Sequence, residues 1–364
     1  MSGARHFPIL IVGAGPSGLA TAYYLQRLRL DFLMLEQEGP GASWAHYYDD
    51  LRLHTRKPNV ALPGLLLAAE LPDFVTGKQY AAYLRSYVEQ FDFPMHVGVR
   101  VARARPANGG WRLETTAGEF TAEHLIVASG IFGNPKRPPL PDRETFGGQI
   151  LDAAAFKSAA PFHGRSVLVV GAGNTGVGVA LSLVQAGAQV GLAVRDGVQL
   201  APLPRNATAT RWKAKVLKWL PDALANALLK GVRRSFGNLG LPAPTKPPLS
   251  VTPVLGFDLV TALREGRVQV HPGLERLSPD GVHFEDGSLQ NYSALILATG
   301  YAPVVDFLPE SLSLSQTGRV ENPTPGLHTV GFHYPTTSPF LLNMRTEAKQ
   351  LAEGLAKNLR VNSK

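Results

Sequence analysis

Two glycine-rich segments are the parts of this 364-residue chain whose residue types and spacing can bind phosphate. They read Gly-Ala-Gly-Pro-Ser-Gly over residues 13–18 and Gly-Ala-Gly-Asn-Thr-Gly over residues 171–176. In this pattern the first glycine permits a tight turn, the second lets a pyrophosphate approach the backbone, and the third lets helix and strand pack closely. The following helix N-terminus adds N–H groups and partial positive charge. The predicted pyrophosphate-binding residues are Gly13, Gly15, Ser17, Gly18, Gly171, Gly173, Asn174, Thr175 and Gly176.

Each turn lies between elements that must position it: an apolar strand, a helix and a second strand. The second strands end differently, because Glu36 lies 23 positions after Gly13 whereas Val194 and then Arg195 occupy the matching place. A carboxylate there accepts ribose hydroxyls and repels a 2′-phosphate, whereas an arginine can pair with that phosphate. We therefore assign NADP(H) to the second turn, with Arg195 on its 2′-phosphate. The alternative is that Arg195 is a solvated charge at the strand end.

The same plan occurs twice along the chain. Gly171 lies 158 residues after Gly13, and each glycine turn is followed, 117 and 129 residues later, by an apolar strand that ends in Ser-Gly or Thr-Gly. We predict an α/β fold of two Rossmann-like domains, one inserted into the other, with a Pro- and Gly-rich junction over residues 134–148. The expected divisions are residues 1–155, 156–300 and a returning segment, 301–364, with a C-terminal helix from about Asn343. We also expect separate strands at 119–121 and 124–130, and a helix over 255–263.

Composition excludes several kinds of chemistry. The chain has no cysteine, which rules out dithiol chemistry, a thiolate nucleophile and cysteine-ligated metal. The sequence shows no metal-ligand cluster and no nucleophile elbow. It has no apolar run long enough to span a bilayer, and the N-terminus enters a strand without room for a signal peptide. We therefore expect a cytoplasmic protein.

Positive charge is concentrated in one segment. Residues 205–246 contain nine Lys or Arg and one acid, Asp222, whereas the remaining 27 basic and 27 acidic residues balance. The apolar spacing here predicts two amphipathic helices with basic faces. Three interpretations stay open: a solvated face of the NADP(H) domain, weak contact with an anionic membrane, or nucleic-acid binding. We expect no nucleic-acid partner, because no recognition module accompanies the charge.

Several motifs occur together in an order typical of one family. They are GAGPSG at 13–18, GASW at 41–44, LRLHTRK at 51–57, Phe146-x-Gly148 with Phe156-Lys157-Ser158, GAGNTG at 171–176, LGLPAP and TPVLGFD within 239–258, and LATGY at 297–301. With them the chain resembles the class B flavin-containing monooxygenases, and especially the YUCCA-type enzymes and their bacterial relatives. The resemblance covers nearly the whole chain. It departs at Asp152, where the family's identifying motif has histidine.

The resemblance implies an enzyme that uses FAD in the first site and NADP(H) in the second. NADPH would reduce FAD, and O₂ would form a C4a-(hydro)peroxyflavin that oxygenates a small organic substrate: a sulfur or nitrogen centre, a ketone or a 2-oxo acid. An NADPH oxidase or reductase, and a non-catalytic nucleotide-binding protein, remain as alternatives. The sequence selects neither the substrate nor the oligomeric state.

Further residues are assigned to the site by their positions in these motifs. Glu36 would hold the FAD ribose, with Ser43 and Trp44 along the flavin; a core position is the less favoured alternative for Trp44. Thr299, Gly300 and Tyr301 would lie where the chain returns to the first domain. His54 is a ligand-site or a structural histidine, Asp152 an interdomain acceptor or an exposed turn residue, and Asn343 a ligand contact or a helix cap. Lys57 is expected near the flavin edge.

Overall fold

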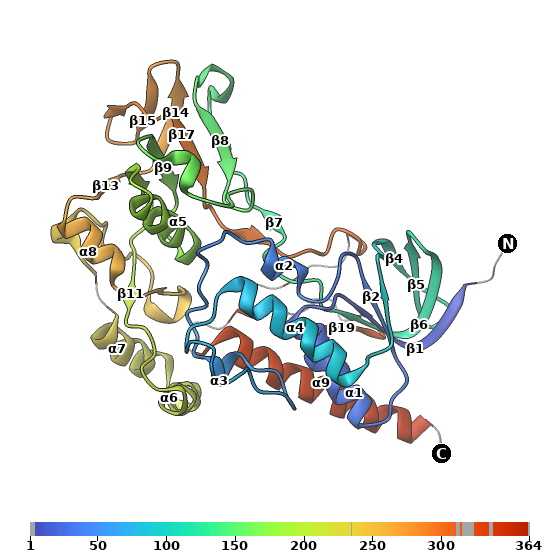
Figure 1. Ribbon diagram of the computed structural model, residues 1–364. Coiled ribbons are helices and arrows are strands. Elements are labelled where there is room, and N and C mark those ends of the chain that lie inside the picture. Colours follow the sequence, from blue (N-terminus) through green and yellow to red (C-terminus); the bar gives the residue numbers. More distant parts are fainter. Residues whose placement is uncertain (1–3, 234, 311–313, 315–323, 335–337, 363–364) are drawn as a thin grey trace. The chain divides into compact units, whose positions relative to one another are not determined.

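The computed structural model describes residues 4–362 except 234, 311–313, 315–323 and 335–337, and the chain divides into two compact units (Figure 1). Unit 1 comprises residues 1–46, 55–134 and 303–364, and unit 2 comprises residues 47–54 and 135–302. Unit 2 is therefore inserted into unit 1, as the repeat predicted. The main segment of unit 2 begins at residue 135 and not at the predicted residue 156, because strand β8 (Gln149–Asp152) pairs with β17 (Ala294–Leu297) inside unit 2.

Unit 1 is built around a seven-stranded sheet. Its strand order is β3-β2-β1-β6-β5-β4, with β19 paired to β6. The pairs β3–β2, β2–β1, β1–β6 and β6–β19 are parallel, whereas β6–β5 and β5–β4 form an antiparallel meander. The strands are β1 (Arg5–Val12), β2 (Leu33–Glu36), β3 (Met95–Val97), β4 (Val101–Ala107), β5 (Gly110–Thr115), β6 (Gly118–Val127) and β19 (Leu327–Thr329).

Strand β6 corrects the prediction of two separate strands at 119–121 and 124–130. It is continuous over ten residues, because β1 pairs along residues 120–127, while β5 pairs with residues 118–122 and β19 with residues 125–127. Its buried residues, including Phe120 and Leu125, join Leu10 and Trp111 in the core of this sheet.

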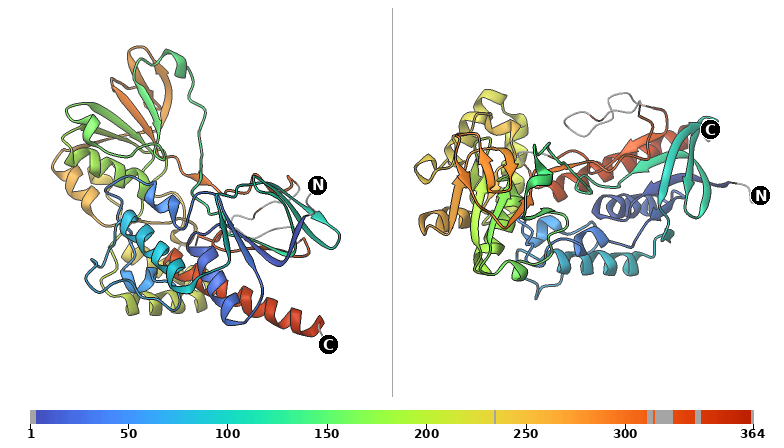
Figure 2. Two further views of the ribbon diagram at one scale, coloured as in Figure 1. Left: turned by 45° about the vertical axis from the view of Figure 1, so that its right-hand side comes forward. Right: turned by 90° about the horizontal axis from the view of Figure 1, so that it is seen from above.

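The helices of unit 1 come from both ends of the chain. They are α1 (Pro16–Arg27), α2 (Ala42–Ala45), α3 (Lys57–Val60), α4 (Gly77–Phe91) and α9 (Phe340–Asn362). A capping box starts α4, where Thr76 and Gln79 satisfy each other's backbone N–H groups. Helix α9 begins three residues before the predicted Asn343 and packs on α1, so the C-terminal segment completes unit 1 (Figure 2).

Unit 2 contains a second parallel sheet, of strand order β13-β10-β9-β17-β8. Helix α5 (Asn174–Gln185) packs on β9 and β10, and its inward face supplies Val179 and Leu183 to a core with Val167 and Phe156. The remaining sheet strands are β9 (Ser166–Val170), β10 (Gln189–Ala193) and β13 (Val268–His271).

Smaller elements complete unit 2. A three-stranded antiparallel sheet comprises β14 (Leu274–Ser278), β15 (Gly281–Phe284) and β16 (Leu289–Gln290), and β11 (Leu200–Ala201) pairs with β12 (Val254–Leu255). Helices α6 (Ala207–Trp219) and α7 (Asp222–Val232) confirm the two helices predicted in the basic segment. Helix α8 (Asp258–Arg264) starts later than the predicted residue 255, because Gly256 has a φ of +95° and follows β12. The short strands β7 (Asn134–Pro135) and β18 (Tyr301–Ala302) and the 3₁₀ turns Arg143–Thr145, Ala160–Phe162, Gly237–Leu239 and Pro248–Ser250 connect these elements.

Within the described part of the chain, no helix combines the length and apolar character needed to span a bilayer.

Candidate active site: two dinucleotide turns

Each of the three glycines in the turn of unit 1 has different surroundings. Gly13 adopts a φ of +105°, and a Cβ there would lie 2.7 Å from the carbonyl oxygen of Ala128. A Cβ on Gly18 would lie 2.0 Å from the carbonyl oxygen of Gly13, so only glycine permits this approach of helix to turn. Gly15 differs, because its Cβ would meet no atom within 4 Å and would point into open space. That space is where a pyrophosphate would approach the backbone.

The turn of unit 2 repeats this geometry closely. Gly171 also has a φ of +105°, with its Cβ position 2.6 Å from the carbonyl oxygen of Ala298, and a Cβ on Gly176 would lie 1.9 Å from the carbonyl oxygen of Gly171. A Cβ on Gly173 would again meet nothing within 4 Å. Both turns therefore satisfy the shape requirement for a dinucleotide pyrophosphate.

The helix after each turn presents its N-terminus to that space. Gly15 and Gly173 are the N-caps of α1 and α5, and among the described residues no side chain caps either helix and no acid lies in either first turn. The first N–H groups of a helix carry partial positive charge and suit an anion. The side chain of Ser17 is buried against Gly331, so Ser17 can serve a phosphate through its backbone N–H.

Glu36 is fixed at the end of β2, beside the first turn. One carboxylate oxygen accepts a hydrogen bond from Ala14 N at 2.7 Å, and the other accepts from Glu38 N at 2.9 Å and Gly39 N at 3.3 Å. A carboxylate has about four lone-pair sites, so one remains for a ribose hydroxyl. These bonds orient the group, as its predicted function requires.

Arg195 lies just after β10, where the matching strand of unit 1 carries Glu36. Its side chain is 75% exposed and forms an ion pair with Asp196 at 3.6 Å. An exposed pair of this kind contributes little stability, so the guanidinium can turn toward a ligand at small cost. Asp196 directly follows Arg195 in the chain and was not among the predicted site residues.

His54 and Asn174 lie together in unit 2. Asn174 opens α5, and its amide donates to Pro253 O and accepts from Leu255 N, both at 3.0 Å. This contact holds the TPVLGFD segment against the glycine turn, so the Asn174 side chain is used in positioning, and its backbone N–H is the group that would contact a phosphate. Burial lowers the pKa of His54, against the opposing effects of a hydrogen bond with Asn174 and the charge of Asp258. His54 is therefore a neutral, hydrogen-bonded histidine at neutral pH.

Asp152 is not an exposed turn residue. It ends β8, its side chain is 17% exposed, and it accepts hydrogen bonds from Nε and Nη2 of Arg137 at 2.8 and 2.6 Å. The negative charge also contributes to the raised pKa of Tyr301, whose largest cause is burial. Within unit 2, Asp152 thus has an ion-pair partner where the family motif has histidine.

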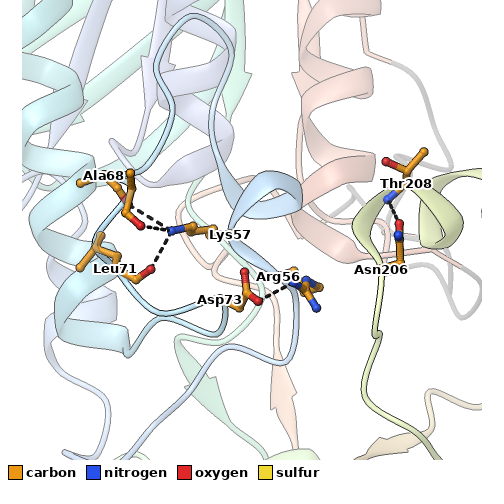
Figure 3. A network of polar contacts seen from close by, with 8 residues as sticks. Arg56, Lys57, Ala68, Leu71, Asp73, Asn206 and Thr208 are labelled. Atoms are coloured by element: carbon orange, nitrogen blue, oxygen red, sulfur yellow. Dashed lines mark hydrogen bonds and ion pairs between the residues drawn. The ribbon is translucent and has the colours of Figure 1, made fainter.

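Lys57 contacts a loop of its own unit rather than a ligand space. Its ammonium donates to the carbonyl oxygens of Ala69 and Leu71 at 2.6 and 2.7 Å, and to Ala68 at 3.4 Å (Figure 3). An ammonium has three donors, so this arrangement leaves none for a flavin. A direct hydrogen bond from Lys57 to the flavin would require it to leave these carbonyls, and its placement at the flavin edge stays a prediction. The neighbouring Arg56 is held by Asp73.

Ser43 and Trp44 lie in the short helix α2. Ser43 is exposed, whereas Trp44 is half-buried and packs edge-on against the buried Tyr80, with ring centroids 4.9 Å apart. Trp44 therefore contributes one face to the core of unit 1, and Ser43 is accessible to a ligand.

The Ser-Gly and Thr-Gly strand ends are also equivalent. Gly130 and Gly300 both have a φ of +93°. Ser129 donates its hydroxyl to Val304 O at 2.5 Å, and Thr299 donates to Lys136 O at 2.5 Å. Ser129 and Gly130 therefore fix the backbone where the chain leaves the sheet of unit 1, and Thr299 and Gly300 do so in unit 2, where Tyr301 follows them in β18.

Asn343 is the fourth residue of α9, so it is not an N-cap. Its amide donates to Glu347 at 2.6 Å, and the other carboxylate oxygen of Glu347 accepts from Gly331 N at 3.0 Å. Gly331 touches Ser17 of the first turn. Asn343 therefore does not cap α9. It supports the glycine turn through Glu347 and Gly331.

The sequence did not reveal the role of three tyrosines in α4. Tyr80, Tyr83 and Tyr87 are buried at helical spacing, and their hydroxyls also donate to Val60 O, Leu65 O and Pro63 O at 3.1, 2.8 and 2.6 Å. They thereby fix the loop that follows α3. A tyrosine at every third or fourth position, instead of leucine, was the available signal that hydroxyl partners were needed.

Two such turns, one followed by an acid and the other by an arginine, define a protein that binds two dinucleotides. Residues 10–219 match the family model described as pyridine nucleotide-disulphide oxidoreductase. The chain is 34% identical over 372 residues to the probable indole-3-pyruvate monooxygenase YUCCA1 of Arabidopsis thaliana, covering 95% of this chain and 89% of the relative. It is 33% identical over 371 residues to the indole-3-pyruvate monooxygenase YUCCA1 of Oryza sativa subsp. japonica, covering 95% and 90%. The chain therefore belongs to the YUCCA-type flavin-containing monooxygenases.

Solved structures show the same fold. A flavin-containing monooxygenase from Stenotrophomonas maltophilia aligns with a TM-score of 0.75 at 21% identity, covering 98% of this chain and 99% of that one. Cyclohexanone monooxygenase from Rhodococcus sp. Phi1 bound to NADP⁺ aligns with a TM-score of 0.71 at 17% identity, covering 98% and 85%. Together with the family, the two turns identify an FAD- and NADPH-dependent monooxygenase.

The composition separates this chain from disulphide chemistry. It has no cysteine, so its own side chains cannot form a redox-active disulphide. The described residues also contain no group of three or more His, Cys, Asp or Glu side chains placed to hold a metal ion. The residues described above instead fit two nucleotide cofactors.

Proposed function

We propose that this monooxygenase acts on a 2-oxo acid with an aromatic side chain, in a reaction of the indole-3-pyruvate type. The observation that carries the proposal is the nearly full-length match to relatives named indole-3-pyruvate monooxygenases, at 32–34% identity. The cyclohexanone monooxygenases are only 16–17% identical and share the fold. The relatives therefore favour a 2-oxo acid over a cyclic ketone.

The proposed reaction consumes one 2-oxo acid, one O₂, one NADPH and one proton. It releases the carboxylic acid shortened by one carbon, CO₂, water and NADP⁺. Bound FAD supplies the redox chemistry, accepting hydride from NADPH and delivering one oxygen atom from O₂. The bond between the keto carbon and the carboxylate breaks, the keto carbon gains one oxygen, and the second oxygen leaves as water.

The side chains of this protein have binding and positioning roles in the proposal. The turns at Gly15 and Gly173 hold the two pyrophosphates, Glu36 holds the FAD ribose, and Arg195 binds the 2′-phosphate. Neutral His54, hydrogen-bonded to Asn174, helps to hold the second turn and the TPVLGFD segment in place. No acid or base is required to activate a nucleophile, because the reactive group belongs to the flavin.

A product assay tests the proposal. Protein reconstituted with FAD is given NADPH, O₂ and indole-3-pyruvate, phenylpyruvate or cyclohexanone, and NADPH, CO₂ and organic products are quantified. We expect one carboxylic acid and one CO₂ for each NADPH with the 2-oxo acids, and one ¹⁸O atom in the acid from ¹⁸O₂.

Catalase is the essential control, because H₂O₂ released by an uncoupled flavoprotein would itself decarboxylate a 2-oxo acid in solution. Acid formation that disappears when catalase is added would show that the protein is an NADPH oxidase with these substrates. A lactone from cyclohexanone, with no acid from either 2-oxo acid, would assign a ketone substrate instead.

A further inference from the structure

Helix α6 exposes its aromatic residues. Ala214 is buried on the inner face, whereas Trp212 is 68% exposed and Trp219 is 89% exposed. The two tryptophans are seven residues apart, about two helical turns, so they share one side of the helix. Lys213 and Lys215 are exposed. They follow Trp212 by one and three residues, so at about 100° per residue they lie on opposite sides of this aromatic stripe around the helix axis.

Helix α7 is anchored through one set of side chains and exposes another. Asn226 accepts a hydrogen bond from Leu249 N at 2.9 Å, and Arg233, which follows the helix, donates to Gln199 Oε1 at 3.0 Å and Val251 O at 2.8 Å. These bonds hold α7 on unit 2. Leu224 and Leu228, four residues apart, remain 49% and 52% exposed.

Exposed apolar groups are concentrated in these two helices. Of the ten large hydrophobic side chains that are exposed among the described residues, five lie within residues 212–232. The same segment carries the excess charge, because residues 205–246 hold nine basic residues and one acid. Scattered exposed hydrophobics need no explanation, but a cluster with aromatic and basic residues marks an interaction surface.

The chemistry of this surface fits a lipid interface. Tryptophan is favoured at the level of lipid headgroups, where its ring is apolar and its N–H stays hydrated, and lysines bind anionic headgroups. Exposed leucines gain from contact with acyl chains but have no partner on a phosphate backbone, which argues against nucleic acid. We propose that the α6–α7 surface, formed by Trp212, Lys213, Lys215, Trp219, Leu224 and Leu228, docks on an anionic membrane. The protein would lie on the bilayer and not cross it.

Vesicle sedimentation tests the proposal with the FAD-loaded protein. Vesicles of phosphatidylcholine with phosphatidylserine should sediment the protein at low salt, and vesicles of phosphatidylcholine alone should do so much less. Trp212→Ala/Trp219→Ala should weaken binding at least about tenfold, the value for removing one buried large side chain. Lys213→Glu/Lys215→Glu should weaken it about 25-fold or more, since each cation near an anionic surface contributes about fivefold.

Matched controls remove exposed residues elsewhere. Leu66→Ala/Leu289→Ala deletes two exposed hydrophobic side chains, and Arg103→Glu reverses an exposed charge on β4. Both should bind vesicles like the original protein, and all variants should keep the same rate of NADPH oxidation. Tryptophan emission gives a second readout: it should shift to shorter wavelength with anionic vesicles, and Trp212→Phe/Trp219→Phe should lose the shift.

Three outcomes would overturn the proposal. One is no binding to anionic vesicles at low salt. Another is binding that the tryptophan and lysine variants retain in full. The third is tighter binding to single-stranded RNA than to anionic vesicles, with loss of RNA binding in the same variants, which would assign the surface to nucleic acid.

Discussion

Gly15 and Gly173 are the two turn glycines at which an added side chain would meet no protein atom, so we propose that it would meet the cofactor instead. Their φ values of −76° and −75° are open to any residue, and a Cβ at either has no atom within 4 Å. The other glycines of each turn lie against backbone carbonyls. One motif therefore contains residues required for folding and residues required for binding, which the sequence pattern cannot separate.

Valine at these positions should separate the two roles. Gly15→Val should weaken FAD binding by at least about tenfold, by occupying the space of the pyrophosphate, without lowering the thermal stability of the cofactor-free protein. Gly173→Val should have the corresponding effect on NADP⁺. Titrations followed by flavin and tryptophan fluorescence give the affinities. Gly18→Ala is the matched folding variant, and it should lower stability because its methyl group would clash with Gly13. Equal stability losses in all three would contradict the distinction.

We propose that Arg195 selects NADPH over NADH. Arg195→Ala should raise KM for NADPH by about 10- to 100-fold, the value of one charge-assisted contact of 1.5–3 kcal/mol, and leave KM for NADH nearly unchanged. Initial rates of NAD(P)H oxidation measure both. Arg267→Ala is the control, because Arg267 is also an exposed arginine of unit 2 paired with a nearby acid, Glu265. Equal changes for NADPH and NADH would remove the assignment of Arg195 to the 2′-phosphate.

The sequence predicted the strand–turn–helix position of both glycine segments and the place of Glu36 at the end of β2, because phosphate geometry dictates those residue types at those spacings. Their roles in cofactor binding stay predictions. The sequence could not show the contacts of Lys57 or Asn343. Their partners are backbone carbonyls at residues 68–71 and the carboxylate of Glu347, and the loop geometry that selects them follows no sequence period. The ion pair between Arg137 and Asp152 was hidden for the same reason.

Strands β6 and β19 are joined by a histidine pair as well as by their backbones. His328 Nε2 and His124 Nδ1 lie 3.2 Å apart. Burial, together with the neighbouring His124, lowers the pKa of His328 to about 4. In the unfolded chain a histidine has a pKa of about 6.5. Between these values the unfolded chain binds a proton that the folded chain does not, so the free energy of unfolding must fall as the pH is lowered.

His328→Asn should therefore flatten the acid limb of the stability curve. The original protein should lose on the order of 2 kcal/mol of unfolding free energy between pH 7 and pH 4.5 through this residue, and the variant should lose correspondingly less. Urea unfolding of cofactor-free protein across this pH range measures the difference. The same slope in both proteins would show that the pair does not control acid stability.

Element boundaries were predicted best where one face of the element is buried. Helix α4 has buried residues at helical spacing and a Thr-x-x-Gln start, and both signals lie in the sequence. Strand β6 was divided wrongly, because β1 pairs along both halves while β5 is replaced by β19 as the other neighbour, without a break in the backbone. Sheet neighbours come from distant parts of the chain, so local pattern cannot supply them.

We propose that the two units divide the cofactors between them, with FAD in unit 1 and NADP(H) in unit 2. FAD should slow amide hydrogen exchange in residues 13–18 and 36–39 of unit 1, and NADP⁺ should slow it in residues 171–176 of unit 2. The physical reason is that each pyrophosphate covers the N–H groups of one helix N-terminus. Exchange measured by mass spectrometry, with Gly15→Val and Gly173→Val as paired controls, distinguishes the sites. Protection of the second turn by FAD alone would reverse the assignment.

The pairing of β6 with β19 has a consequence for the order of folding during synthesis. In unit 1, residues 125–127 can pair with residues 327–329, and Ser17 can contact Gly331, only after those later residues have been translated. Every residue of unit 2 has been translated by position 302. Domains generally fold as units while the chain emerges, so unit 2 can complete its sheet before unit 1 can. We expect ribosome-bound chains to acquire protease resistance in unit 2 first, and limited proteolysis of stalled chains would detect the opposite order. The inserted unit would then fold first in each molecule, although translation begins with the other unit.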